Sequence, residues 1–310
     1  MEWYLFFAII VALLVFDLGV FNKKDRVMNT RDSILYSLFY FTVGLLFGVY
    51  IWMTFGITIA AEYLTGFLIE KTLSLDNIFL ISMIFTYFNI PAKYQHRVLF
   101  WGIIGVIVMR GILIYLGAAI VANYGWVMYI FGAFLIFTGI KMLILGGHST
   151  INLEDIKIIK FLQKYFPITS ELHGNKFFVR INKNGKYKLY TTPLFIALLL
   201  VEFSDLIFAV DSVPAIFSIT NNIFVIYTSN IFAILGLRAL YFAILIVIER
   251  FKYVKYSLSI VLVFIGSKIF LKDIFNLEKF PPLISLGVTV GIIMMGVIVS
   301  LIKTKKSETA

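Results

Sequence analysis

Residues 201–215 read VEFSDLIFAVDSVPA and place three acidic side chains, Glu202, Asp205 and Asp211, inside an apolar stretch. A second segment, residues 70–77, reads EKTLSLDN and repeats part of this pattern. In both segments an acidic residue, five intervening residues, Asp and a small polar residue follow one another. A carboxylate at the centre of a membrane helix costs about 2.5–3.5 kcal/mol on insertion scales, so such residues are rare and mark function. These two segments therefore decide how the chain is interpreted.

The rest of the chain is strongly apolar. Of its 310 residues, 61% are hydrophobic and 14% are charged, and the mean hydropathy is +0.96. A soluble domain is roughly 45–50% apolar and about 25% charged, so we exclude a soluble enzyme, a disordered chain and a nucleic-acid-binding protein. The absence of cysteine excludes disulfides, thiolate metal sites and thiol redox chemistry. We expect all three histidines in loops: His96, His148 and His173.

Membrane-spanning helices need about 20 mostly apolar residues. Nine stretches are candidates: 3–20, 34–53, 62–87, 98–121, 125–145, 193–217, 223–248, 256–272 and 282–302. We therefore predict an all-α polytopic membrane protein with nine transmembrane helices, which together form a single transmembrane domain over residues 1–310.

The distribution of basic residues predicts the orientation, because Lys and Arg near span ends favour the cytoplasm. Most of the 27 basic residues fall in the loops after spans 1, 3, 5 and 7 and in the C-terminal tail. The alternate loops hold only Lys272 and Lys279. We therefore expect the N-terminus outside and the C-terminus in the cytoplasm, and the net charge of +10 gives no reason to invoke nucleic acid.

One polar stretch of any size, residues 146–192, divides the chain. We expect a short helix followed by a hairpin, since the turn signal Asn182-Lys-Asn-Gly185 lies between Val179 and Tyr187. A solvated cytoplasmic connector between two halves is the ordinary interpretation of such a loop. The alternative is a docking surface for a partner protein.

The halves on either side of this loop resemble each other at three places. Besides the two acidic segments, Arg110 in the fourth span matches Arg238 in the seventh, and Gly139 in the fifth matches Gly266 in the eighth. The matches keep their order along the chain, which is hard to ascribe to chance.

These matches predict an inverted repeat. The third span runs inward and the sixth runs outward in the expected orientation, so units 62–145 and 193–272 have opposite directions, with 282–302 as a final span. Inverted repeats are typical of secondary transporters, whose sites lie near the bilayer midplane at the repeat interface.

Eight charged residues lie within the predicted spans: Glu70, Lys71, Asp76, Arg110, Glu202, Asp205, Asp211 and Arg238. Their insertion cost, on the order of 20–28 kcal/mol, exceeds the net stability of a typical fold, so they must face a polar interior and pair. The acids outnumber the bases by two, which a divalent cation or protonation balances equally well. We expect Arg110 and Arg238 to act as counter-ions, since a bound cation repels them.

The residue types favour a hard cation. Helical spacing puts Glu70, Ser74 and Asn77 on one face of the third span, with Asp76 about 100° away. Carboxylate, amide and hydroxyl oxygens suit Mg²⁺, Ca²⁺ or Mn²⁺, whereas zinc and copper usually recruit Cys or His. We predict that Asp76 and Asp211 bind substrate; the alternative is that they are interhelical hydrogen-bond partners. We expect no enzyme, because the chain has no His-Glu-x-x-His motif and no convincing Ser/His pair.

Three stretches carry a resemblance to a known family: residues 70–77, residues 201–215, and residues 230–242, which read NIFAILGLRALYF. They resemble the TerC/Alx family of bacterial membrane proteins, and the resemblance covers about residues 2–303. It implies a fold near the LysE exporter superfamily, an association with tellurium resistance, and efflux of Mn²⁺, which is the substrate and not a cofactor.

The resemblance also implies metal-site roles for particular residues. The matching positions are Asp76, Asn77, Asp205, Asp211 and Ser212, with Glu70 and Glu202 as secondary candidates. We therefore expect a Mn²⁺ exporter of the bacterial inner membrane with a carboxylate-lined site between inverted repeats. From the residues alone Mn²⁺, Ca²⁺ and Mg²⁺ are equivalent, since all three accept oxygen ligands.

Two other functions stay open at this point. One is a non-transporting membrane component of a tellurite-resistance or envelope-stress assembly, which docks through residues 146–192 and uses its buried charges structurally. The other is an exporter of a cationic organic solute, which the LysE resemblance allows.

Overall fold

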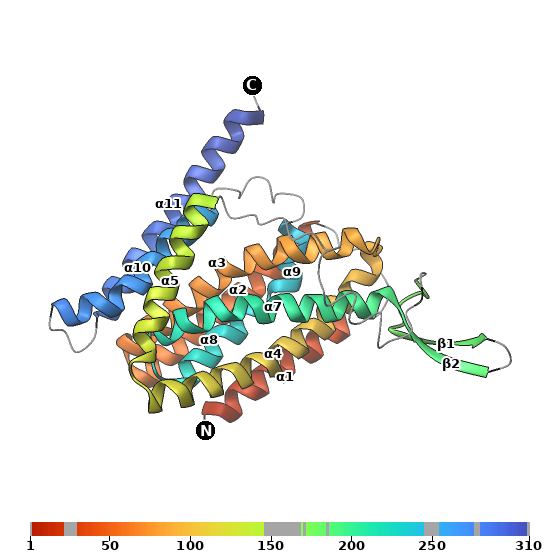
Figure 1. Cartoon of the computed structure of the whole chain (residues 1–310), viewed down its shortest axis with the longest axis horizontal. Helices are drawn as coiled ribbons and strands as arrows, with labels where there is room; N and C mark the ends of the chain where they lie inside the picture. Colours follow the sequence, from red (N-terminus) through yellow and green to blue (C-terminus); the bar gives the residue numbers. More distant parts are fainter. Residues whose placement is uncertain are drawn as a thin grey trace.

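The computed structural model describes residues 2–21, 30–145, 169, 172–183, 186–244, 254–275 and 280–308. Apart from one hairpin, the elements in this part of the chain are α-helices (Figure 1). They are α1 (Glu2–Phe21), α2 (Thr30–Phe55), α3 (Ile57–Tyr87), α4 (Ala92–Asn123), α5 (Val127–Leu145), α7 (Pro193–Phe217), α8 (Ile223–Leu235), α9 (Leu237–Ile244), α10 (Val254–Ile274) and α11 (Pro282–Glu308).

The chain is an all-α polytopic membrane protein. Six segments of the described residues are long and apolar enough to cross a membrane: Arg31–Phe55, Ala92–Asn123, Val127–Ile144, Pro193–Phe217, Ile223–Ala243 and Pro282–Ile302. The other predicted spans, 3–20, 62–87 and 256–272, coincide with α1, α3 and α10. The total of nine spans stays a prediction.

The helices begin and end where their residues dictate. Gly56 separates α2 from α3 with a φ of 87°, a left-handed conformation that glycine adopts without steric cost. Pro193 is the first residue of α7, where its missing N–H would have no helical partner anyway. Asn222 caps α8, because its side chain accepts hydrogen bonds from the N–H groups of Phe224 and Val225.

The packing of the helices brings the two halves of the chain together. α3 packs on α8 and on α7, while α7 packs on α4. α5 lies along α10, and α11 packs on both α3 and α10. Figure 1 shows that α5 and α11 cross the common direction of α3, α4 and α7.

Glycines allow the close contact between α5 and α10. A Cβ atom on Gly266 of α10 would lie 2.6 Å from the carbonyl oxygen of Gly132 on α5. A Cβ atom on Gly139 of α5 would lie 2.7 Å from the carbonyl oxygen of Ser259 on α10. The backbones therefore approach as closely as they do in small-residue contacts of membrane helices. Gly139 and Gly266, which match in the sequence, lie on the two sides of this seam.

The seventh predicted span, 223–248, is not one continuous helix. α8 ends at Leu235 and α9 begins at Leu237, with Gly236 between them. The break interrupts the apolar segment Ile223–Ala243.

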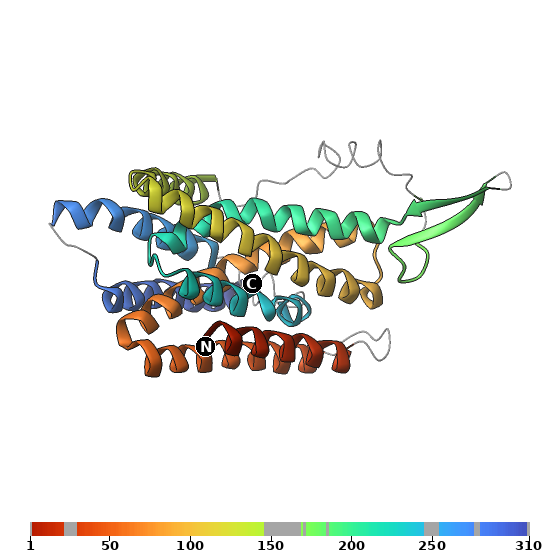
Figure 2. The same cartoon turned by 90° about the horizontal axis from the view of Figure 1, so that it is seen from below.

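The predicted hairpin is confirmed in the middle loop. β1 (Phe178–Lys183) pairs antiparallel with β2 (Lys186–Thr191). Figures 1 and 2 show it projecting beyond the ends of α4 and α7. The short helix predicted before it falls outside the described residues. The expectation that every histidine lies in a loop is wrong for His96, which is in α4; His173 precedes the hairpin, and His148 lies outside the described residues.

Candidate functional site

A buried arginine of α4 binds side chains from neighbouring helices. Arg110 of α4 forms an ion pair with Glu70 of α3, with 2.6 Å between Nη1 and Oε1. It forms a second ion pair with Asp205 of α7, with 3.2 Å between Nη2 and Oδ1. Its Nε also donates to Asp205 Oδ2 at 3.2 Å, so the guanidinium binds this carboxylate through two parallel hydrogen bonds.

Neutral side chains complete the arrangement. Arg110 Nη1 donates to Ser212 Oγ at 3.1 Å and to Asn230 Oδ1 of α8. Asn77 Nδ2 of α3 donates to Asp205 Oδ1 at 3.1 Å. We call this set the Arg110 cluster; its members are Glu70, Asn77, Arg110, Asp205, Ser212 and Asn230.

The cluster is closed off from solvent, yet some of its oxygens have no donor. Glu70 and Arg110 are each 1% exposed. Among the described residues, Glu70 Oε2 and Asn77 Oδ1 are buried without a hydrogen-bond partner. A cavity of about 20 Å³ is lined in part by Asn77, Ser204 and Asp205, which is room for about one water molecule. A bound cation or a water molecule satisfies buried acceptor oxygens that have no donor, such as these two.

Glu202 lies one helical turn before Asp205 on α7 but outside the hydrogen bonds of the cluster. Its carboxylate occupies the space where a side chain on Gly105 of α4 would be. Its Oε2 is also buried without a partner in the part of the chain that is described. Gly105 therefore makes room for a third acidic group next to the cluster.

The second arginine has different partners from the first. Arg238 of α9 forms an ion pair with Asp17 of α1, and its Nη1 lies 2.8 Å from His96 Nε2 of α4. Tyr40 of α2 donates to Asp17 Oδ1 at 3.1 Å. Asp17 is 3% exposed, so it is a buried counter-ion of Arg238. The two matched arginines thus hold different parts of the bundle.

Two predicted site residues are described only in part. Asp76 and Asp211 belong to α3 and α7, directly before Asn77 and Ser212, but their side chains lie outside the described residues. In the described residues, no group of three or more His, Asp or Glu side chains is arranged to hold a metal ion. Asn230 is the member of the cluster that sequence reasoning did not assign to the site, although it is a buried amide in an otherwise apolar helix.

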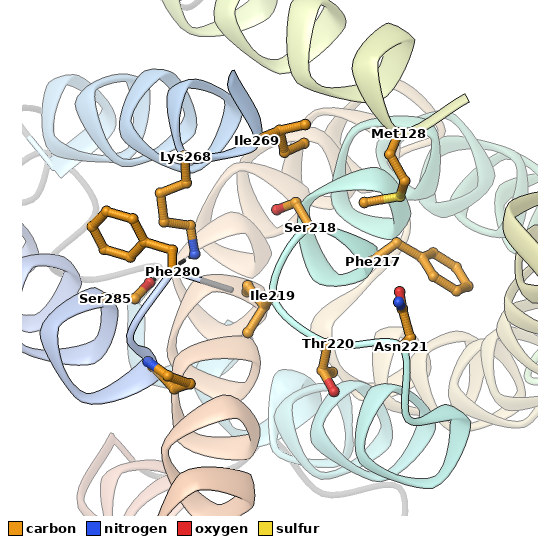
Figure 3. Close-up of a pocket in the computed structure, with 11 residues that line it drawn as sticks. Met128, Phe217, Ser218, Ile219, Thr220, Asn221, Lys268, Ile269, Phe280 and Ser285 are labelled. Atoms are coloured by element: carbon orange, nitrogen blue, oxygen red, sulfur yellow. Dashed lines mark hydrogen bonds between the residues drawn. The ribbon is translucent and has the colours of Figure 1, made fainter. Parts of the chain in front are cut away.

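A larger cavity of about 250 Å³ lies at the end of α7 (Figure 3). The amine of Lys268 points into it and donates to Ser285 Oγ at 2.8 Å. Lys268 is 5% exposed, so this residue does not extend to the membrane surface as long side chains at span ends often do. Ser218, Thr220 and Asn221 contribute the other polar groups of the wall.

Comparison with known proteins assigns the chain to a family. Residues 55–308 match the profile of the integral membrane protein TerC family. The chain belongs to the TerC family. Its TerC relatives include an "Uncharacterized membrane protein" of Rickettsia bellii, 52% identical over 303 residues that cover 98% of both chains.

Two other TerC relatives extend the comparison. The "Uncharacterized membrane protein STKORF319" of Myxococcus xanthus is 43% identical over 308 residues, covering 99% of this chain and 94% of that protein. The "Putative membrane-bound redox modulator Alx" of Escherichia coli (strain K12) is 43% identical over 304 residues, covering 95% and 92%. No solved structure matches. The TerC chain is therefore an integral, multi-pass membrane protein, and none of these names denotes an enzyme.

Proposed function

We propose that this TerC protein exports a divalent cation, Mn²⁺, from the cytoplasm through the Arg110 cluster. One observation carries the proposal: Glu70 Oε2 and Asn77 Oδ1 are buried without a donor, and Asn77 lines a small cavity together with Asp205. These are hard oxygen ligands, which suit Mn²⁺, Mg²⁺ and Ca²⁺. The choice of Mn²⁺ rests on the resemblance to the TerC/Alx family.

In this proposal Arg110 replaces the transported ion when the site is empty. Glu70 and Asp205 already bind one positive charge, the guanidinium of Arg110. A divalent cation that binds the same carboxylates is repelled by that guanidinium, since like charges at short distance in a low dielectric repel strongly. Loading therefore requires Arg110 to release at least one carboxylate. Asp76 and Asp211 complete the ion's ligands, with Ser212 and Glu202 as further oxygen donors.

The packing of the helices supports alternating access between inverted repeats. α3, the first helix of unit 62–145, packs on α8, which corresponds to the second helix of unit 193–272. The equivalent contact with the two units exchanged is that of α7 with α4. α3 with α7, and α5 with α10, are the pairs expected on either side of a pseudo-two-fold axis. We propose that units 62–145 and 193–272 rock against each other around the cluster. The orientation in this proposal is N-terminus outside and C-terminus inside, in the inner membrane.

The experiment is manganese content and efflux in bacteria that lack their own manganese exporters. The wild type is compared with Asp76→Asn, Asp211→Asn and Asp205→Asn at equal levels in the membrane. Asp32→Asn is the matched control, because Asp32 is an exposed residue in the first turn of α2. The proposal expects low cell manganese with the wild type and the control, and high manganese with the three variants at Asp76, Asp211 and Asp205. Unchanged manganese with the wild type contradicts it.

A second candidate function is a non-transporting membrane component, and the hairpin is the observation that favours it. Residues 172–191 contain five Lys or Arg residues and no Asp or Glu, and the hairpin projects beyond the helices. Such a surface suits an acidic partner protein. The redox role in the name of the Alx relative cannot use thiols of this chain, which has no cysteine. Charge-neutral variants of the Arg110 cluster that fold but lose metal flux favour the transporter. Variants that no longer fold or assemble with a partner favour the non-transporting membrane component.

Export of a cationic organic solute is the third candidate. Competition decides it: an organic cation that lowers manganese flux and is itself carried supports this candidate, whereas competition by divalent metals alone supports the metal exporter.

A further inference from the structure

Lys71 is a charged residue of α3 that the cluster does not use. Its neighbour Glu70 binds Arg110, but Lys71 points to a different helix. Its Nζ donates to the carbonyl oxygen of Ala233 in α8 at 2.9 Å. A lysine inside a predicted membrane span that binds a backbone carbonyl needs an explanation, since such residues are costly there.

The carbonyl that Lys71 binds lies at the break between α8 and α9. Ala233 is in the last turn of α8, which ends at Leu235. The last four carbonyls of a helix have no partner within that helix, and they carry the negative end of the helix dipole. Lys71 therefore supplies a donor where the interrupted helix leaves an acceptor, and it does so from the other sequence repeat.

The break is shaped to admit this amine. A Cβ atom on Gly236 would lie 2.8 Å from Lys71 Nζ and 3.0 Å from the Cβ atom of Tyr40. Any larger residue at 236 therefore has to displace the amine or the aromatic side chain. Glycine at the break and lysine on α3 thus fit together.

The same end of α8 is bound to the Arg110 cluster. Asn230, about one turn before Ala233, accepts a hydrogen bond from Arg110. The C-terminal half of α8 is therefore held by two cationic side chains, Lys71 of α3 and Arg110 of α4. Glu70 connects them, because it precedes Lys71 in the chain and binds Arg110. The two contacts on α8 are thus connected through adjacent residues of α3.

We propose that Lys71 is a positioning residue of the transport cycle, which holds the α8–α9 break closed through the carbonyl of Ala233 and releases it when an ion displaces Arg110. This inference rests on the proposed function for its role in transport. The contact itself, and the closed break, do not depend on which substrate is carried.

The test uses the natural absence of cysteine, which makes every introduced cysteine a unique label site. Ala239→Cys places the label on α9, at a position that is 2% exposed. Ala197→Cys is the matched control on α7, at a position that is fully buried. Labelling by N-ethylmaleimide is measured on the full-length protein in membrane vesicles, with Lys71 unchanged, with Lys71→Met and with Lys71→Arg. Manganese flux is measured on the same vesicles.

The proposal expects Lys71→Met to raise the labelling rate of Ala239→Cys about tenfold, the effect of losing one buried hydrogen bond on a local opening. Ala197→Cys stays protected, and Lys71→Arg, which keeps a donor, restores slow labelling and part of the flux. Equal labelling of Ala239→Cys in all three backgrounds overturns the proposal, as does faster labelling at both cysteines, which indicates general unfolding. If the wild type carries no manganese while the labelling pattern holds, the proposed function fails, but the role of Lys71 in holding the α8–α9 break closed stands.

Discussion

Replacing Arg110 by Met tests whether the cluster is held by buried ion pairs. The substitution keeps an unbranched apolar side chain but removes the guanidinium that binds Glu70 at 2.6 Å and Asp205 at 3.2 Å. It also removes the donor to Ser212 and Asn230. Two carboxylates are then left next to each other without a cation.

The magnitude follows from the burial of these groups. Removing one partner of a buried ion pair costs about 3–5 kcal/mol, because the other charge stays buried and uncompensated. Arg110 has two such partners and is 1% exposed, so we expect a loss at the upper end, about 4–5 kcal/mol. The triple variant Arg110→Met, Glu70→Gln, Asp205→Asn removes the charges together, and we expect it to recover to within about 1–2 kcal/mol of the wild type.

The assay is reversible unfolding in mixed micelles of increasing SDS content, followed by tryptophan fluorescence. Arg31→Met is the control, since Arg31 is exposed at the start of α2. If Arg110→Met stays within about 0.5 kcal/mol of the wild type, the range of ordinary surface substitutions, the ion pairs do not hold these helices together. A triple variant as unstable as the single one contradicts the electrostatic explanation.

Two further substitutions test the packing of α5 on α10 and the start of α8 by the same assay. Gly266→Leu forces a side chain against the carbonyl oxygen of Gly132, 2.6 Å from the new Cβ atom, and we expect it to lower the free energy of unfolding by about 1–3 kcal/mol through overpacking between α5 and α10. Gly287→Leu is its control, since no described atom lies within 4 Å of a Cβ placed there. Equal losses in the two variants contradict the close contact of α5 with α10. Asn222→Ala removes the side chain that accepts from two N–H groups at the start of α8, and we expect a loss of about 0.5–2 kcal/mol, whereas Asn222→Ser retains most of the stability; an alanine variant as stable as the wild type contradicts the cap.

The sequence predicts that the buried charges pair, but it identifies neither the partners of Arg110 nor those of Arg238. Charges in apolar spans must pair, and helical spacing gives the face on which each one lies. Spacing within one helix does not identify the helix across from it. Arg238 meets Asp17 of α1, which hydropathy places at a span end beside a basic stretch. This pairing depends on how α1 packs against α9, which only the structure describes.

Hydropathy also does not show where a helix extends into polar residues or where it is interrupted within an apolar run. α4 begins at Ala92, although its apolar run begins several residues later, because backbone hydrogen bonds continue into the polar residues around His96. The break at Gly236 lies within an apolar run, and a glycine in a helix costs only about 1 kcal/mol, so its presence alone does not predict an end. The contact from Lys71 accompanies the break.

The most direct test of the central claim is Mn²⁺ flux by the purified protein in liposomes. We compare the wild type, Asp205→Asn and the exposed control Asp32→Asn at equal amounts of reconstituted protein. The account predicts Mn²⁺ flux with the wild type and the control, and flux near that of empty liposomes with Asp205→Asn, whose carboxylate lies in the Arg110 cluster. Wild-type flux equal to empty liposomes, or full flux with Asp205→Asn, contradicts it.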